Sequence, residues 1–254
     1  MLRPRIIPVL LYQDDGLVKT VKFKNSKYVG DPLNAVKIYN EKKADELIFL
    51  DIDATVKNLS PNYKLIEKIA NQSRMPICYG GGIKTAEQAK RIFSLGIEKI
   101  ALSSIGISNP AIITKIASEV GNQSVVIVLD IKKSLLGKYE LYTHNATTKS
   151  KVDIEKYVKS LRELGAGEIV VNNIDRDGTL KGYDLDLITY ISSLTDLPIT
   201  SVGGVGKIEH FQSLLQHCDI TGLGAGSLFV FKGRYKAVLI NYPDFTLKKR
   251  ICQL

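Results

Sequence analysis

The chain of 254 residues contains no tryptophan, two methionines, three histidines and three cysteines. Cys78, Cys218 and Cys252 are odd in number and fit no metal-binding spacing, so we interpret them as reduced, structural thiols of a cytoplasmic protein. The histidines are equally scattered, and we expect no metal ion and no other cofactor. No apolar run reaches the length of a membrane span, and the amino-terminal residues lack the apolar stretch of a secretory signal, so no membrane association is expected.

The chain also lacks a recognisable linker. No segment rich in proline, serine or glycine divides it, and 44% of its residues are hydrophobic. The length lies within the single-domain range of α/β barrels. We therefore expect one large core in a single domain that spans residues 1–254.

Basic residues exceed acidic ones, and the net charge is +9. No nucleic-acid-binding motif accompanies this charge, so no nucleic-acid partner is expected. We interpret the cluster Lys248, Lys249 and Arg250 as solvated surface. The lysines between residues 19 and 27 predict a mobile loop that meets an anionic substrate.

Apolar runs of strand length alternate with amphipathic segments of helix length. The runs lie at residues 6–11, 47–50, 77–79, 100–102, 125–129, 169–171, 199–202 and 220–223. Helical patterns between them include residues 32–43, 85–95, 110–120, 154–164 and 185–194. Eight buried strands, each followed by a helix or its place, predict a closed (βα)8 TIM barrel; an open doubly wound sheet is the competing fold. Residues 138–144 alternate in polarity after the fifth strand and predict a small hairpin inserted into a loop.

Two small-residue turns repeat at one offset. Gly80-Gly81 and Gly203-Gly204 lie 123 residues apart, and so do Ser103-Ser104 and Gly226-Ser227 (203 minus 80 and 226 minus 103). Each ends an apolar run and opens a helical pattern, where glycine and a helix amino-terminus suit a bound anion. The repeat favours two similar half-barrels, each with one phosphate-binding site. Together the two sites would suit a substrate with a phosphate at each end. The alternative is that the small residues serve only the close packing of barrel turns.

Aspartates follow several apolar runs, at the strand ends where barrels carry their active sites. They include Asp51, Asp53, Asp130 and the acidic positions within residues 175–179. Each could act as a general acid or base, or could cap a helix instead. The fifth run ends in Asp130, but the first ends in Leu11, and leucine neither donates nor accepts a proton. A symmetric pair of acids across the barrel is therefore excluded.

Several longer motifs occur along the chain. They are Arg5-Ile6-Ile7-Pro8, Gly16-Leu17-Val18-Lys19, Gly30-Asp31-Pro32, residues 44–52, Gly80-Gly81-Gly82-Ile83, Tyr142-Thr143-His144, residues 165–169 and Asp175-Arg176-Asp177-Gly178-Thr179. With these motifs the chain resembles the cyclase subunit of imidazole glycerol phosphate synthase over nearly its whole length. The segment 22–25 and the hairpin fit this cyclase better than the related isomerase of the same pathway.

The resemblance implies a barrel that receives ammonia from a glutaminase subunit docked at its amino-terminal face. Ammonia would pass through the barrel to a phosphorylated small molecule at the carboxy-terminal face. The family's two catalytic aspartates end the first and fifth strands; Asp130 matches the second, and Leu11 stands where the first is expected. The implied substrate- and phosphate-binding residues are Lys19, Gly82, Ser103, Ser104, Asp177, Gly178, Gly204, Gly226 and Ser227.

Four charged residues at the starts of strands match the family's ammonia gate. The resemblance implies that Arg5, Glu46, Lys99 and Glu168 form a ring of opposite charges at the amino-terminal mouth. Considered without the resemblance, they are ordinary strand ends, where exposed ion pairs contribute little stability. All four charges are present, which indicates that the channel is retained.

Three functions remain open at this point. The first is a specialised paralogue that conducts ammonia, with a glutaminase and a separate sugar amidotransferase, for amidation of a surface-polysaccharide sugar; the chain resembles that subgroup, including Leu11. The second is a genuine cyclase of histidine biosynthesis, with a replacement acid among residues 12–15. The third is a non-catalytic scaffold that activates its glutaminase.

Overall fold

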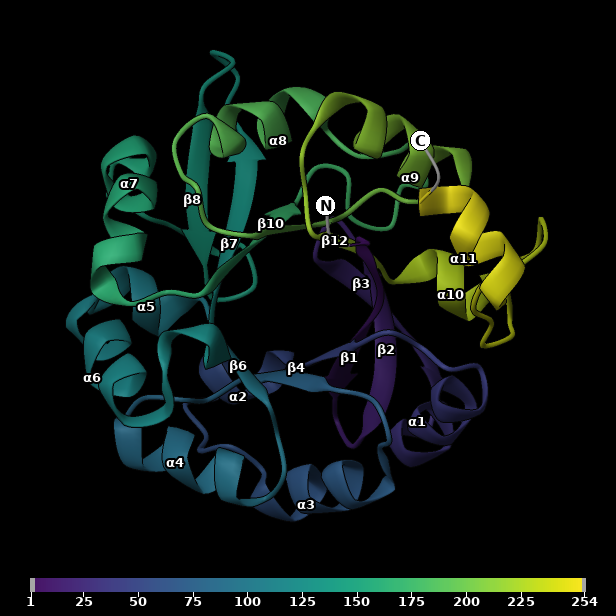
Figure 1. The fold of residues 1–254 in the computed structure, drawn as a ribbon, viewed down its shortest axis with the longest axis horizontal. Coiled ribbons are helices and arrows are strands. Elements are labelled where there is room, and N and C mark those ends of the chain that lie inside the picture. Colours follow the sequence, from purple (N-terminus) through teal and green to yellow (C-terminus); the bar gives the residue numbers. More distant parts are fainter. Residues whose placement is uncertain (1–2, 253–254) are drawn as a thin grey trace.

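A computed structural model describes residues 3–252 of the chain. Eight parallel strands form a ring around its centre (Figure 1). In ring order they are β1 (Arg5–Gln13), β4 (Leu47–Asp51), β5 (Ile77–Gly80), β6 (Lys99–Leu102), β7 (Val125–Lys133), β10 (Glu168–Asn173), β11 (Ile199–Val202) and β12 (Gly222–Ala225). The ring closes because β10 pairs with β7 and β12 pairs with β1. The predicted (βα)8 TIM barrel is confirmed, and the open doubly wound sheet is excluded.

Helices lie around this ring (Figure 1). They are α1 (Pro32–Glu41), α2 (Ile52–Val56), α3 (Tyr63–Gln72), α4 (Ala86–Ser94), α5 (Ser104–Ser108), α6 (Ala111–Val120), η1 (Asn122–Ser124), α7 (Ile154–Leu164), α8 (Leu185–Ser192), α9 (Glu209–His217), α10 (Ser227–Val230) and α11 (Phe245–Cys252). The longer ones lie on the outer side of the ring, and the short α2, α5 and α10 lie at its carboxy-terminal end. Asp31, Thr85, Asp153 and Asp184 cap four of them, each accepting a hydrogen bond from the third helical N–H. Within residues 3–252, no helix is long and apolar enough to cross a membrane.

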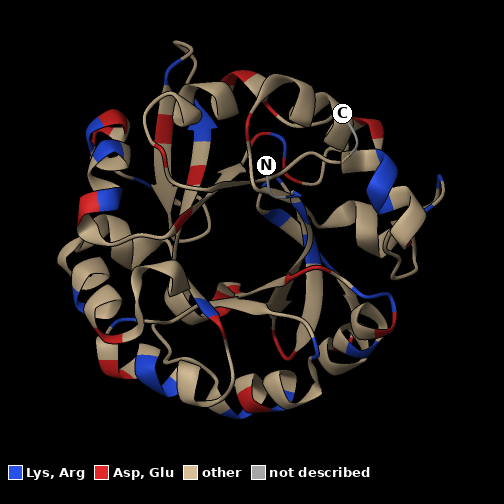
Figure 2. Cartoon of the chain, in the orientation of Figure 1, with Lys and Arg blue, Asp and Glu red and all other residues tan. Residues whose placement is uncertain are grey.

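The alternation of side chains along the strands creates two apolar cores. One face of each strand packs against the helices, and the other face points into the barrel. Charged residues gather on the outer helices (Figure 2). The inner core consists of Ile7, Val9, Ile48, Cys78, Ala101, Val126, Val128 and Val170. A packed apolar interior therefore separates the two mouths of the barrel.

Two antiparallel hairpins extend from the ring at its carboxy-terminal side. β1 continues into β2 (Gly16–Val21) and β3 (Lys24–Gly30), and β7 continues into β8 (Tyr139–Thr143) and β9 (Thr148–Lys149). The prediction of a loop over residues 19–27 is therefore wrong. The long β1 offers its backbone groups beyond the barrel, and β2 pairs with them, which leaves Lys19 only 6% exposed.

The carboxy-terminal segment packs beside β1 and the connection between α1 and β4. It includes a small hairpin of β13 (Phe231–Lys232) and β14 (Ala237–Val238), followed by α11. Tyr242 donates a hydrogen bond of 2.7 Å to the Ile6 carbonyl. The Lys248 ammonium donates to Asp45 at 2.7 Å and to the Lys43 carbonyl at 2.9 Å. The prediction of a solvated cluster is thus wrong for Lys248, because its position on α11 faces the barrel.

A matched pair of glycines tests how tightly the turn after β11 is packed. Gly204 has φ +99°, and an added Cβ would lie 2.2 Å from the Gly182 carbonyl oxygen; Gly137 has φ +80° with nothing within 4 Å. Gly137→Ala should cost about 1–2 kcal/mol of unfolding free energy from backbone strain alone. Gly204→Ala should cost roughly 1–3 kcal/mol more because of the clash. Urea unfolding measures both, and equal losses would contradict this packing.

Candidate functional site

A cavity of about 410 Å³ opens at the carboxy-terminal ends of the barrel strands. Asp130 and Leu11 line it, from β7 and β1, which lie opposite each other in the ring. The residues predicted to bind substrate or phosphate all line the same cavity: Lys19, Gly82, Ser103, Ser104, Asp177, Gly178, Gly204, Gly226 and Ser227. Residues far apart in the sequence are therefore brought to one concave surface.

The sequence repeat corresponds to two equivalent corners of this cavity. Gly81 and Gly82 follow β5 with φ of +131° and +70°, and Gly203 and Gly204 follow β11 with φ of +101° and +99°. These backbone conformations strongly favour glycine. The short helices α5 and α10, which begin at Ser104 and Ser227, follow the next strand in each half. Each corner thus combines a glycine turn with small residues that let a ligand approach the backbone.

Asp130 is the carboxylate at the centre of the cavity wall. The Ser103 hydroxyl donates to its Oδ2 at 3.1 Å, and the Asn172 amide donates to its Oδ1 at 2.9 Å. Removal from bulk water deep in the barrel raises the pKa of Asp130 to about 6, although both hydrogen bonds act in the opposite direction. The carboxylate is therefore ionised at neutral pH but close enough to its pKa to accept and return a proton.

Leu11 contributes an apolar side chain opposite this carboxylate. It packs with the inner core next to Leu50 and carries no proton-transfer group. The neighbouring acids are engaged elsewhere: Asp15 accepts a hydrogen bond of 2.7 Å from Tyr12, and Asp14 pairs with Lys57 at 2.7 Å. Among residues 12–15, Gln13 is the one that lines the cavity. No replacement acid within residues 12–15 lines the cavity opposite Asp130.

Lys19 and Asp177 hold the β2–β3 hairpin against the cavity. The buried Lys19 ammonium donates to the Val9 carbonyl and lies against Gly226, where an added Cβ would be 2.7 Å from it. Burial lowers the pKa of Lys19 to about 8, opposed in part by Asp177. Asp177 accepts hydrogen bonds from the Thr20 hydroxyl at 2.8 Å and the Phe23 N–H at 3.2 Å. The hairpin is thereby tied to the loop after β10.

Asn172, His144 and Asn145 are among the cavity residues to which the sequence analysis assigned no role. Asn172 contacts Asp130, as described above. The His144 N–H donates to Ser104 at 3.2 Å, and the Asn145 amide donates to the Ile52 carbonyl at 2.8 Å, so the β8–β9 turn lies over the cavity. The alternation Glu168, Val170, Asn172 could have identified Asn172 as an inward position. The contacts of His144 and Asn145 carry no comparable sequence signal.

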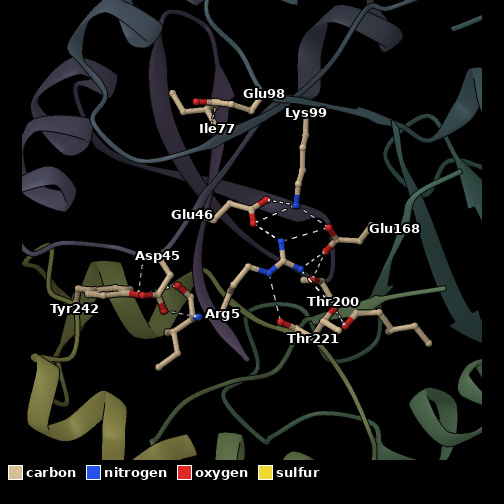
Figure 3. A network of polar contacts seen from close by, with 12 residues as sticks. Arg5, Asp45, Glu46, Ile77, Glu98, Lys99, Glu168, Thr200, Thr221 and Tyr242 are labelled. Atoms are coloured by element: carbon tan, nitrogen blue, oxygen red, sulfur yellow. Dashed lines mark hydrogen bonds and ion pairs between the residues drawn. The ribbon is translucent and has the colours of Figure 1, made fainter. Parts of the chain in front are cut away.

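The four predicted gate residues form a closed ring of ion pairs at the opposite mouth (Figure 3). Lys99 contacts Glu46 at 3.1 Å and Glu168 at 2.8 Å. Arg5 contacts Glu168 at 2.8 Å and also pairs with Glu46. Thr200 donates a further hydrogen bond of 2.6 Å to Glu168. The two acids and two bases therefore alternate around the mouth with no net charge.

Pairing keeps Arg5, Lys99 and Glu168 charged despite burial. Burial alone would lower the pKa of Arg5 and Lys99, but attraction to Glu168 and Glu46 outweighs it and raises both. Burial alone would raise the pKa of Glu168, and the two cations lower it instead. Cys78 lies in the inner core, and burial raises the pKa of its thiol well above the usual range, so it remains neutral. The ring closes one end of the barrel, and an apolar core lies above it.

Comparison with known proteins matches residues 5–236 to the family model described as histidine biosynthesis protein. A Leptospira borgpetersenii protein, provisionally named imidazole glycerol phosphate synthase subunit HisF, is 56% identical over 99% of both chains. The chain belongs to the HisF family. A Vibrio vulnificus relative, provisionally named subunit hisF3 of the same synthase, is 57% identical over 100% of this chain and 98% of its own.

The HisF family also includes more distant relatives of this chain. Subunit HisF of Streptococcus mutans is 37% identical over 90% of this chain and 91% of its own. The family model, which matches residues 5–236, covers both the charged ring and the residues of the cavity named above. The chain is thus a HisF-like subunit built on the complete barrel.

The raised pKa of Asp130 predicts a pH dependence of stability. The folded chain binds the Asp130 proton more tightly than the unfolded chain, whose value is near 3.8. The resulting stabilisation is present below that value and is lost as the pH rises through about 6. Relative to Asp130→Asn, the unfolding free energy of the natural chain should fall by up to about 3 kcal/mol over this range. Urea titrations at several pH values measure the difference, and parallel pH profiles would contradict it.

Proposed function

We propose that this HisF-family chain conducts ammonia along the barrel axis, from a partner glutaminase at the amino-terminal face to an acceptor in the cavity. Support comes from three features that follow one another along the axis: the ring of Arg5, Glu46, Lys99 and Glu168, the inner apolar core, and the cavity. An apolar interior admits neutral ammonia more readily than ammonium, because moving a charge out of water is costly. The glutaminase would hydrolyse glutamine outside the barrel and release ammonia at the ring.

Lys99 is the ring member best suited to open the mouth. Its single ammonium sits on a flexible chain, whereas the planar guanidinium of Arg5 reaches both carboxylates and also the Thr221 carbonyl. If Lys99 swings away, Glu46 and Glu168 each keep one cationic partner. Opening therefore avoids leaving an unpaired buried charge.

The acceptor in this proposal is a phosphorylated small molecule. The glycine turns at Gly82 and Gly204, with Ser104 and Ser227 at the helix starts, would take its phosphate groups through N–H and hydroxyl donors. Lys19 would add positive charge beside the Gly226 corner. Asp130 would serve as general base or acid toward the acceptor.

The position of Leu11 opposite Asp130 supports a more specific function within the family. With leucine opposite Asp130, the end of the first strand supplies no second acid for a two-acid cyclisation. The other carboxylates of the cavity are engaged, because Asp51 caps α2 and Asp177 binds the β2–β3 hairpin. We therefore propose a specialised paralogue that serves amidation of a surface-polysaccharide sugar together with a separate sugar amidotransferase. The provisional numbered name of the 57% identical relative fits a paralogous subgroup.

A genuine cyclase of histidine biosynthesis is the second candidate. It is favoured by Asp130, whose hydrogen bonds from Ser103 and Asn172 hold a carboxylate ready for proton transfer. A scaffold that merely activates a glutaminase would leave the cavity and both glycine corners without a purpose.

Leu11→Asp discriminates between these candidates, with Leu11→Asn as the isosteric control that supplies no acid. The purified chain receives ammonium and the histidine-pathway substrate, and the loss of substrate absorbance is followed. The natural chain and Leu11→Asn should turn over roughly 100- to 10,000-fold more slowly than Leu11→Asp, because one general acid or base is missing. Turnover by the natural chain at the rate of Leu11→Asp would instead establish the genuine cyclase.

Lys99→Ala tests conduction through the ring in a complex of Leu11→Asp with its glutaminase. Product formed per glutamine should fall, while ammonia in the surrounding solution rises. Arg5 still pairs with both carboxylates, so the barrel should remain folded. The control is Lys90→Ala, which removes an exposed pair with Glu119 and should change stability by about 0–1 kcal/mol and coupling not at all. Unchanged coupling in Lys99→Ala would refute conduction gated by the ring.

A further inference from the structure

The side-chain amide of Asn172 has a hydrogen-bond partner at its nitrogen but none at its oxygen among the described residues. Its side chain is on the inner face of β10, directly across from Asp130 in the β7–β10 register, and its residue is 9% exposed. Nδ2 donates to Asp130 at 2.9 Å, but the buried Oδ1 has no hydrogen-bond partner among the described residues. A buried acceptor without a partner is costly, so its presence calls for an explanation.

The surroundings of Asn172 leave its amide orientation to Asp130 alone. Oδ1 faces the turn after β11, at 3.5 Å from the position of a Cβ added to Gly203. Within residues 3–252, no other side chain hydrogen-bonds to Asn172 and fixes which end of its amide points to the carboxyl group. The neighbouring Asn173 differs, because its Nδ2 donates to Asp184 at 2.9 Å and its Oδ1 accepts from the Arg176 N–H at 2.9 Å. Hydrogen bonds therefore hold both the amide nitrogen and the amide oxygen of Asn173, but only the amide nitrogen of Asn172.

We propose that Asn172 is a positioning residue whose side-chain amide flips by about 180° when Asp130 changes its protonation state. Toward the carboxylate, Nδ2 donates to Oδ1 of Asp130, as in the structure. Toward the carboxylic acid, the proton on that oxygen is donated to Oδ1 of Asn172. Because the outward end of the amide is unpartnered, the flip breaks no other hydrogen bond. Asp130 thereby keeps a partner both as base and as acid.

The charges around Asp130 allow this exchange near neutral pH. Burial is the main cause of its raised pKa, and the charge of Asp177 adds to it. Lys19 faces Asp177, and on β8 the cross-strand neighbour of Asp130 is Tyr142. His144 follows at the end of that strand and also lines the cavity. The groups that contact the Asp130 carboxyl directly, Ser103 and Asn172, are both neutral.

This inference rests on the proposed role of Asp130 in proton transfer, but it can be tested without measuring any catalysed reaction. The side-chain amide signals of the full chain are followed by NMR as the pH crosses the midpoint of Asp130, with Asn172 assigned by its loss in Asn172→Leu. Below the midpoint, the Asn172 NH2 protons should show nuclear Overhauser contacts with the Gly203 α-protons, and above it these contacts should disappear. The Asn173 amide is the control within the same spectrum and should keep its contacts throughout.

Variants distinguish a flip of the Asn172 amide from a change in its NMR signals that is caused by the charge of Asp130 alone. Asp130→Asn should abolish the pH dependence of the Asn172 contacts. Asn172→Leu should raise the pKa of Asp130, which means that its acid dissociation constant falls by up to about tenfold. The reason is that the hydrogen bond lost from the carboxylate is stronger than the one lost from the carboxylic acid. Asn172→Thr, whose hydroxyl both donates and accepts, should restore the midpoint. Contacts of Asn172 that do not change with pH, or an unchanged midpoint in Asn172→Leu, would overturn the inference while leaving ammonia conduction untouched.

Discussion

The parallel pairing of β10 with β7 is the constraint on which both ends of the barrel depend. It closes the ring, and closure forces every second residue of each strand into a shared interior. Along β10 alone, Glu168 enters the charged ring, Val170 the apolar core and Asn172 the cavity. The same register sets Asn172 beside Asp130. One strand pair thereby aligns the charged mouth, the apolar core and the cavity.

The two ends of the barrel treat buried charge in opposite ways. At the amino-terminal mouth, each carboxylate meets two cations, so pairing offsets the cost of removing the charges from water. In the cavity, the side-chain donors to Asp130 among residues 3–252 are the neutral Ser103 and Asn172, and desolvation is the largest influence on its pKa. The first arrangement keeps Arg5, Lys99 and Glu168 charged. The second leaves a proton exchangeable, which a general acid or base requires.

The extension of β1 beyond the ring distinguishes the wall opposite Asp130. This extension pairs with β2 and carries Lys19 into a buried position next to Gly226. Leu11 lies at the point where β1 leaves the barrel, and its side chain turns toward the cavity. Lys19 and Leu11 therefore line the cavity from the same hairpin. At the end of β1 the cavity wall carries no acid opposite Asp130.

The sequence supported accurate predictions wherever a local pattern reports burial. All eight barrel strands follow from short apolar runs, and helix α7 follows from its periodicity, because alternation and period express the two faces of an element. The charged ring and the glycine corners were predicted through resemblance and repeat. One error is the mobile loop predicted over residues 19–27, which is instead a hairpin that buries Lys19. The other is Lys248, which was assigned to solvated surface and which tertiary contacts bury.

By itself, the sequence determined the class of the fold, its two-half organisation and the absence of a second strand-end acid at Leu11. Those properties depend on residue types and their order along the chain. Only the tertiary structure decided that Arg5, Glu46, Lys99 and Glu168 neutralise one another, and that Asn172 rather than a charged group steadies Asp130. Coulomb and hydrogen-bond energies depend on distances across the closed barrel, and those distances exist only once the ring has formed.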